Sequence, residues 1–193
     1  MISVSGKIHE LLESKLGEEI ANDYAMDIHS IIISLDNAFS EIRQIIVSVK
    51  NRKYITSEEN IKIQDLIRRI MDNYYRFSER MEIFCNDRLS KCTGKKYSPS
   101  FHENHGKILP ARGSSVHIRE SILTFERRSE NNYTCNNNGP FNSYEGECIG
   151  IIVTFYKKDG VTIFSKDLDF LICDITGSIK HTLTKLEGYI AAS

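Results

Sequence analysis

The sequence predicts an α+β protein: an N-terminal antiparallel helical hairpin or bundle is followed by a small antiparallel β-sheet with a C-terminal covering helix. Two early stretches carry apolar residues at alternating four- and three-residue steps, and a later stretch is rich in β-branched and aromatic residues. Helices that precede the strands, instead of alternating with them, indicate the α+β class. The predicted divisions are a helical hairpin or bundle (1–87), a basic irregular connector (88–115), and the sheet with its helix (116–193).

Residues 7–27 are predicted to be helical with an interruption. Apolar residues from Ile8 to Ile28 recur at every fourth position, and such a stripe drifts around a straight helix. Gly17 lies within the stripe and weakens a helix by roughly 1 kcal/mol relative to alanine. We therefore expect a kink or two separate helices at Gly17.

Residues 28–49 and 63–84 form the predicted hairpin. Their spacing gives each helix a narrow apolar seam, and Thr56 with Glu59 fits a capping box at the start of the second helix. The pattern fits a protruding coiled coil and an ordinary bundle equally well, and it leaves open whether the seam closes within one chain or between two. The predicted partner-binding residues are the seam positions Ile28, Ile32, Leu35, Phe39, Ile42, Ile63, Ile67, Ile70, Tyr74 and Phe77.

The second half of the chain is predicted to form strands and one helix. Residues 116–126 alternate as a strand with a bulge near Ser121, and the polar stretch 129–147 is expected to be a disordered loop. Residues 149–156 are apolar on both faces, which predicts a central strand. A type I′ turn at Asp159-Gly160 would set Phe155 opposite Phe164 and Tyr156 opposite Ile163.

The chain is expected to end with one more strand and a helix. Residues 168–173 are apolar enough for a further strand. Thr176 or Ser178 could then cap a terminal helix, whose apolar residues from Ile179 to Ile190 face one way and would cover one face of the sheet.

The charge of the chain is balanced overall and uneven locally. The 193 residues carry a formal net charge of −1, which predicts no general attraction to nucleic acid or to anionic membranes. Residues 88–119 hold seven basic side chains and one acid, with Tyr97 and Phe101 interleaved, as a contact with phosphates or a single strand would require. The candidate phosphate-binding residues are Lys91, Lys95, Lys96, Lys107, Arg112 and Arg119.

Catalytic and metal-binding patterns are weak. Arg112 and His117 have a spacing similar to the R-x4-6-H motif of the HEPN ribonucleases, in which the pair acts on the RNA backbone. That family places the motif on a helix of an all-α bundle, whereas here it lies in a Gly/Ser turn before a predicted strand. Cys85, Cys92, His102 and His105 carry zinc-type ligands without the paired spacing of a zinc site, so we predict neither a metal nor another cofactor.

These observations favour a non-enzymatic interaction subunit or adaptor that binds a protein partner, or a second copy, through its helical hairpin. The alternatives are a nucleic-acid-binding component that contacts phosphates through residues 88–119, and a small nuclease using Arg112 and His117. Five cysteines without framework spacing, no signal-peptide pattern and no bilayer-length apolar run predict a cytoplasmic protein without a membrane partner.

Overall fold

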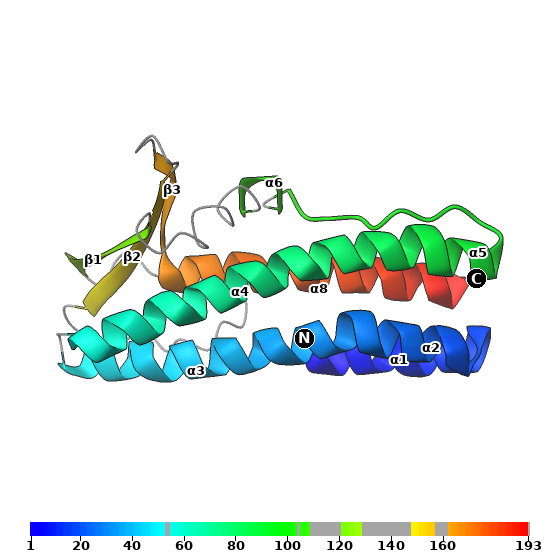
Figure 1. The fold of residues 1–193 in the computed structure, drawn as a ribbon, viewed down its shortest axis with the longest axis horizontal. Coiled ribbons are helices and arrows are strands. Elements are labelled where there is room, and N and C mark those ends of the chain that lie inside the picture. Colours follow the sequence, from blue (N-terminus) through cyan, green and yellow to red (C-terminus); the bar gives the residue numbers. More distant parts are fainter. Residues whose placement is uncertain (53–54, 104, 109–120, 129–147, 157–161, 193) are drawn as a thin grey trace.

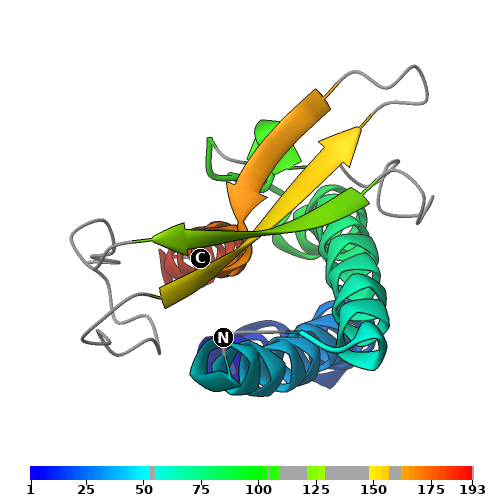
Figure 2. The same ribbon diagram turned by 90° about the vertical axis from the view of Figure 1, so that its left-hand side faces the viewer.

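A computed structural model of the chain describes residues 1–52, 55–103, 105–108, 121–128, 148–156 and 162–192. The long helices lie side by side along the longest axis of the molecule, and a β-sheet lies across one end of them (Figures 1 and 2). The predicted α+β class is confirmed. One hydrophobic core includes residues of the helices and of the sheet. The proposed division at residues 87 and 115 stays a prediction.

The first helix turns back on itself at Gly17. The helices α1 (Ile2–Leu16) and α2 (Glu18–Tyr24) lie beside each other, which confirms the predicted interruption (Figure 1). Gly17 has φ 99° and ψ 167°, a conformation that side chains disfavour and that glycine adopts freely.

The hairpin is confirmed, and it is longer than predicted. A π-helical turn η1 (Ala25–His29) leads into α3 (Ser30–Arg52), and α4 (Ser57–Ile83) returns alongside α3. The buried stripe residue Ile28 lies in this π turn, where the four-residue stripe meets the four-three seam. The capping box is also present, because Glu59 N–H donates to Thr56 Oγ1 and Thr56 N–H donates to Glu59 Oε2.

The connector predicted to be irregular from residue 88 is helical over its first residues, 88–93. The chain stays helical through η2 (Phe84–Leu89) and α5 (Ser90–Thr93), and it ends at Gly94 with φ 66°. The buried side chain of Leu89 anchors this extension, and the Ser90 and Thr93 hydroxyls donate to carbonyl oxygens of the preceding turn. An irregular stretch then leads to the short helix α6 (His105–Ile108).

The sheet has the order β1-β2-β3 and is antiparallel throughout, with strands β1 (Ser121–Arg128), β2 (Cys148–Tyr156) and β3 (Thr162–Asp167). The central position of β2 is confirmed, and its residues 151–155 are all buried. Phe155 pairs with Phe164 as predicted. The pairing of Tyr156 with Ile163 is wrong, because the register shifts after Phe155 and Tyr156 pairs with Thr162.

Three predicted features of the second half fall on segments outside the described residues. They are the strand residues 116–120 before β1, the loop 129–147, and the Asp159-Gly160 turn. From Ser121 onward, the register of β1 against β2 is continuous.

The strand predicted at 168–173 is wrong, because these residues begin the long helix α8 (Leu168–Ala192). The buried residues Leu168, Leu171, Ile172 and Ile175 follow helical steps of three, one and three. The predicted caps are also wrong. Asp167 caps the helix by accepting a hydrogen bond from Asp169 N–H at 2.9 Å, and Thr176 and Ser178 lie within the helix. Near its start α8 contacts β2 and β3, and further along it packs against α1.

Candidate helix-binding face

The ten seam residues that the sequence analysis assigned to a partner all lie in the core of the chain itself. Their apolar side chains pack between α3, α4 and the neighbouring helices, so the seam closes within one chain in this structure. A partner could reach these side chains only by opening the core. Their role in binding a partner stays a prediction, and the exposed faces of the hairpin become the surfaces to consider.

Ion pairs join the two arms of the hairpin, with the acids on the first arm and the bases on the second. Asp23 and Asp27 on the first arm lie 3.5 and 3.8 Å from Arg88 and Arg80 on the second arm. Glu41 of α3 also lies 3.0 Å from Lys62 Nζ and 3.5 Å from Arg69 Nη1 of α4. Each exposed pair contributes about 0–1 kcal/mol, so their combined role is to favour this register of the arms over others.

The outward surface of the first arm carries no charge over residues 25–49. Between residues 25 and 49, every exposed side chain is uncharged, and the charged residues of this stretch are only partly exposed. Met26 is 68% exposed, and Ile33 and Val47 are 39% and 38% exposed. We call the exposed residues that follow alternating four- and three-residue steps the outer α3 face: Met26, Ser30, Ile33, Asn37, Ser40, Gln44 and Val47.

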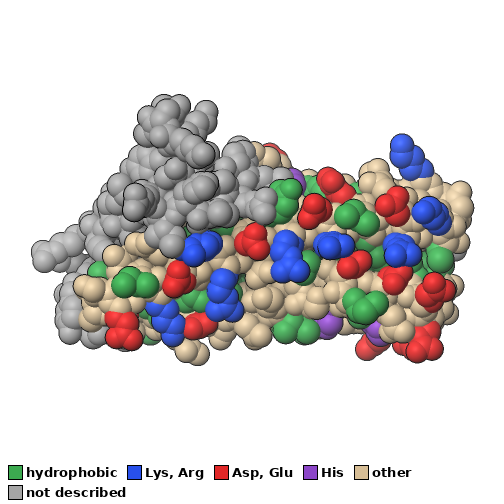
Figure 3. All heavy atoms as spheres, in the orientation of Figure 1, with side chains coloured by type: hydrophobic (Ala, Val, Ile, Leu, Met, Phe, Trp, Pro, Cys, Tyr) green, Lys and Arg blue, Asp and Glu red, His purple; other side chains and the backbone are tan. Residues whose placement is uncertain are grey.

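The exposed surface of α4 is different in character. Most of its exposed residues are charged: Glu58, Lys62, Asp65, Arg69, Arg76, Glu79, Arg80 and Glu82. Figure 3 shows that basic and acidic side chains alternate along the helices on that side of the molecule. Charged residues are 26% of the chain, so a charge-free strip that follows one helix for six turns stands out from the rest of the surface.

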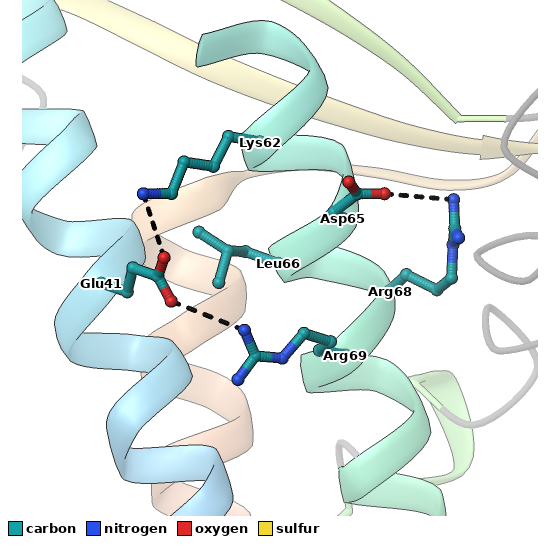
Figure 4. A pocket seen from close by; sticks show the side chains of 6 residues that line it. All are labelled: Glu41, Lys62, Asp65, Leu66, Arg68 and Arg69. Carbon is teal, nitrogen blue, oxygen red and sulfur yellow. Dashed lines mark ion pairs between the residues drawn. The ribbon is translucent and has the colours of Figure 1, made fainter. Parts of the chain in front are cut away.

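A groove of about 430 Å³ follows the boundary between α3 and α4. The carboxylate of Glu41 lies between the Lys62 and Arg69 side chains and beside Leu66, while Asp65 and Arg68 pair on the far side of α4 (Figure 4). Because these cations are paired with carboxylates, the groove is not built to hold a free anion. It forms a polar border along one side of the outer α3 face.

A buried polar network fixes α1 to the first arm of the hairpin. The Ser5 hydroxyl lies 2.7 Å from the Tyr24 hydroxyl and 2.9 Å from His29 Nδ1. Burial raises the pKa of Tyr24, and burial with the charge of His9 lowers the pKa of His29. This network is an element of the core, because Ser5 and Tyr24 are both fully buried.

A second network of the same composition joins α4, α6 and α8. The Tyr74 hydroxyl lies 2.7 Å from Ser178 Oγ and 2.9 Å from His105 Nδ1. Burial raises the pKa of Tyr74 to about 12 and lowers the pKa of His105. Phe101 stacks on the His105 ring at 4.2 Å between ring centres. A serine, a tyrosine and a histidine are here in contact, but Ser178 and Tyr74 are buried and offer a substrate no access.

The candidate phosphate-binding residues are only partly brought together. Lys91, Lys95 and Lys96 are exposed near the end of α5, whereas Arg112, Arg119, His117 and the side chain of Lys107 lie outside the described residues. The aromatic residues of this segment stack within the chain. The ring centres of Tyr97 and of Tyr189 in α8 are 4.0 Å apart, and the Phe101 ring stacks on the His105 ring. One face of each of these rings is therefore already occupied within the chain.

The zinc-type ligands do not converge. Cys85 is buried, its thiol contacts Met81 Sδ, and burial raises its pKa to about 12, while Cys92 is exposed. In the part of the chain that the structure describes, no group of three His, Cys, Asp or Glu side chains could hold a metal ion. Of the aspartates near β3, Asp167 caps α8 and Asp174 pairs with Lys166.

Sequence reasoning missed the outer α3 face, although the signal was present. The same helix carries two sets of residues at four-three spacing, and only the more apolar set was recognised as a seam. The second set becomes visible when the charged residues are marked, because they all avoid it.

The fold and this face define an α+β protein with a long helical hairpin that exposes one uncharged helical surface. No family model, curated protein or solved structure matches the chain. Within the described residues, the structure holds no helix with the length and apolar character needed to cross a bilayer.

Proposed function

We propose that this protein is a non-enzymatic interaction subunit that binds an α-helix of a protein partner through the outer α3 face. The observation that carries the proposal is the segregation of charge between the two arms: from residue 25 to residue 49 the exposed residues are uncharged, whereas those of α4 are mostly charged. Interface cores are depleted of charged residues relative to the remaining surface.

The spacing of the outer α3 face fits a helical partner. Residues at alternating four- and three-residue steps form a straight strip that packs against a second helix with side chains interdigitated. Met26, Ile33 and Val47 supply apolar anchors, and full burial of such side chains stabilises a contact by roughly 1.5–3 kcal/mol each. The Ser, Asn and Gln side chains between them can hydrogen-bond across the contact, and so would favour one register of the partner helix.

The rigid interior supports an interaction role. The buried seam, the ion pairs of Glu41 with Lys62 and Arg69, and the hydrogen bond that Asn73 Nδ2 donates to Ser34 Oγ hold α3 against α4. A helix fixed in this way loses little conformational entropy when a partner docks. Cys85, Cys92 and Cys173 are not joined in disulfides, as expected for the cytoplasmic location that belongs to this proposal.

The test is the mass of the protein purified from its own host, measured by light scattering for three forms. Ser40→Arg places a charge at the middle of the outer α3 face, and Glu79→Arg is the matched control on the exposed surface of α4. We expect the wild type and Glu79→Arg to have a mass above the 22.1 kDa of the chain, and Ser40→Arg to have the mass of the chain alone. A larger mass that Ser40→Arg leaves unchanged would refute the proposal, as would a wild type that is a monomer in its host.

A second candidate function is contact with phosphates through Lys91, Lys95 and Lys96. Its support is that all three side chains are exposed within six residues of one another. Binding of a single-stranded oligonucleotide should then weaken steeply with salt, and the triple Lys→Gln variant should bind less tightly with a smaller salt dependence. Equal binding by this variant would eliminate the candidate.

A further inference from the structure

We infer that the partner of the outer α3 face is a second copy of this chain, packed antiparallel about a two-fold axis. This inference rests on the function proposed above and names the occupant of the same face. It is carried by the charges that border the face on its two sides.

The borders of the outer α3 face are distinct. Asp27, Ser34 and Glu41 follow one side, and His29, Asp36 and Arg43 follow the other. Asp27 and Glu41 already have basic partners on α4. Among the described residues, neither Asp36 nor Arg43 has an ion-pair partner. The Arg43 guanidinium lies over the Phe39 ring, 5.9 Å from its centre, and its Nε is buried without a hydrogen-bond partner. An acid and a base that both lack an ion-pair partner thus lie seven residues apart on the same border.

A parallel arrangement of two copies brings like charges together. Opposite borders meet in a parallel helix pair, so Asp36 of each copy would face Glu41 of the other. Like charges side by side weaken an interface, and here they would occur twice because the contact is symmetric.

In an antiparallel pair, each border meets the same border of the second copy. Among the registers that preserve the interdigitated packing, two overlap most of the outer α3 face. One register centres on residue 35. It sets Asp36 opposite Asp36 and Asp27 opposite Glu41, which places acids against acids on both borders. The charges therefore disfavour this register as well.

The other antiparallel register centres between Ala38 and Phe39, and it pairs Asp36 of each copy with Arg43 of the other. Among the side chains that the structure describes, no like charges meet, because Ser34 faces Glu41 and Asp27 faces Ser48. Within the face, Asn37 lies at the level of Ser40 of the second copy, and Ile33 lies at the level of Gln44. Of the three arrangements, this one alone pairs the unpaired acid with the unpaired base.

The dimer is expected to be reversible. One pair of helices buries less than the roughly 1,200–2,000 Å² of a standard stable interface. We therefore expect a dissociation constant on the order of 10 μM, within reach of sedimentation and light scattering.

A charge-exchange experiment on the purified full chain tests the inference. Asp36→Arg alone would set Arg against Arg, and Arg43→Asp alone would set Asp against Asp, so each variant should be a monomer at concentrations where the wild type is a dimer. Mixing the two variants restores both ion pairs in a heterodimer, and the Asp36→Arg/Arg43→Asp double variant restores them in a homodimer. We expect at least a tenfold loss of affinity in each single variant and recovery in the mixture and in the double variant. Ser40→Arg should abolish the dimer, and Glu79→Arg should leave it intact.

The outcomes separate this inference from the proposed function. A purified wild type that stays monomeric up to about 200 μM overturns the second copy as the partner. The proposed function then still stands if the host-derived protein has a larger mass that Ser40→Arg abolishes. A dimer that Ser40→Arg does not disrupt refutes the inference, and a dimer without recovery in the mixture overturns the antiparallel register. Unchanged circular dichroism of the variants shows that they are folded.

Discussion

The hydroxyl oxygen of Tyr74 lies 2.7 Å from Ser178 Oγ, so one hydrogen bond joins α4 to α8 across 104 residues of sequence. His105 shares the same tyrosine hydroxyl and attaches α6 to this contact. The helical half and the C-terminal helix are thereby held in one core, behind the face that we propose binds a partner.

Tyr74→Phe should destabilise the protein, because it leaves the Ser178 hydroxyl without this buried partner. The expected loss is about 1–3 kcal/mol in the free energy of unfolding, measured by urea denaturation. The Tyr74→Phe/Ser178→Ala double variant removes both hydroxyls, and it should be at least as stable as Tyr74→Phe because no serine oxygen is left unsatisfied. A single variant as stable as the wild type would contradict the assigned hydrogen bond.

Stability should fall as the solution is acidified below pH 6.5. Burial lowers the pKa of His29 and His105 below the ordinary value of 6.5. The unfolded chain therefore binds more protons than the folded chain in this range, and the stability that is fully present above pH 6.5 is lost as the pH falls through the lowered values. Urea titrations between about pH 7.5 and about pH 5.5 measure the slope, and His105→Asn should reduce it. An equal slope in this variant would exclude His105 as a source.

Replacing glycine by alanine should stabilise the protein at Gly6 and Gly177 and destabilise it at Gly17. Gly6 and Gly177 lie within helices, and a Cβ at either position meets nothing within 4 Å, so alanine should stabilise the protein by about 0.5–1 kcal/mol at each. Gly17 has the same open space but a φ of 99°, and alanine there should destabilise by about 1–3 kcal/mol. Thermal denaturation of the three variants checks the signs. A destabilising Gly177→Ala would show that this part of α8 is in closer contact than the structure shows.

Thr56→Ala should remove the capping box of α4 at a cost of about 0.5–2 kcal/mol. Glu59 N–H then loses its acceptor, and the Glu59 carboxylate loses the Thr56 hydroxyl. Ser57→Ala, at the exposed next position, is the matched control and should change stability by less than about 0.5 kcal/mol. Chemical denaturation distinguishes the two, and equal effects would contradict the capping role.

The parts of the fold that local physics determines could be predicted from the sequence. The seam spacing, the capping residues Thr56 and Glu59, and the conformational freedom of Gly17 act over a few residues, and each feature was confirmed. The central position of β2 could also be predicted, because a strand with apolar residues on both faces must be covered on both sides.

The errors came from segments whose local preference is ambiguous. Leu168 to Cys173 is a short apolar run that fits a strand or a buried helix, and the hydrogen bond from Asp169 N–H to Asp167 decides for the helix. Ser178 looked like a cap because serine favours helix starts, but its hydroxyl is instead bonded to Tyr74, a contact 104 residues away that no local pattern shows. The same limit applies to the outer α3 face. Its meaning depends on which side of α3 the core occupies, and only the packing of the other helices determines that.

The most direct test of the proposed binding face is hydroxyl-radical footprinting of the protein isolated from its host, compared with the same protein after dilution to a monomer. Met26 on the outer α3 face and Ile61 on α4 are 68% and 62% exposed, and so form a matched pair. Each oxidation rate is normalised to that of the same residue in the unfolded chain. We predict that assembly protects Met26 and leaves Ile61 unchanged. Protection of Ile61 with an unchanged rate at Met26 would contradict the account.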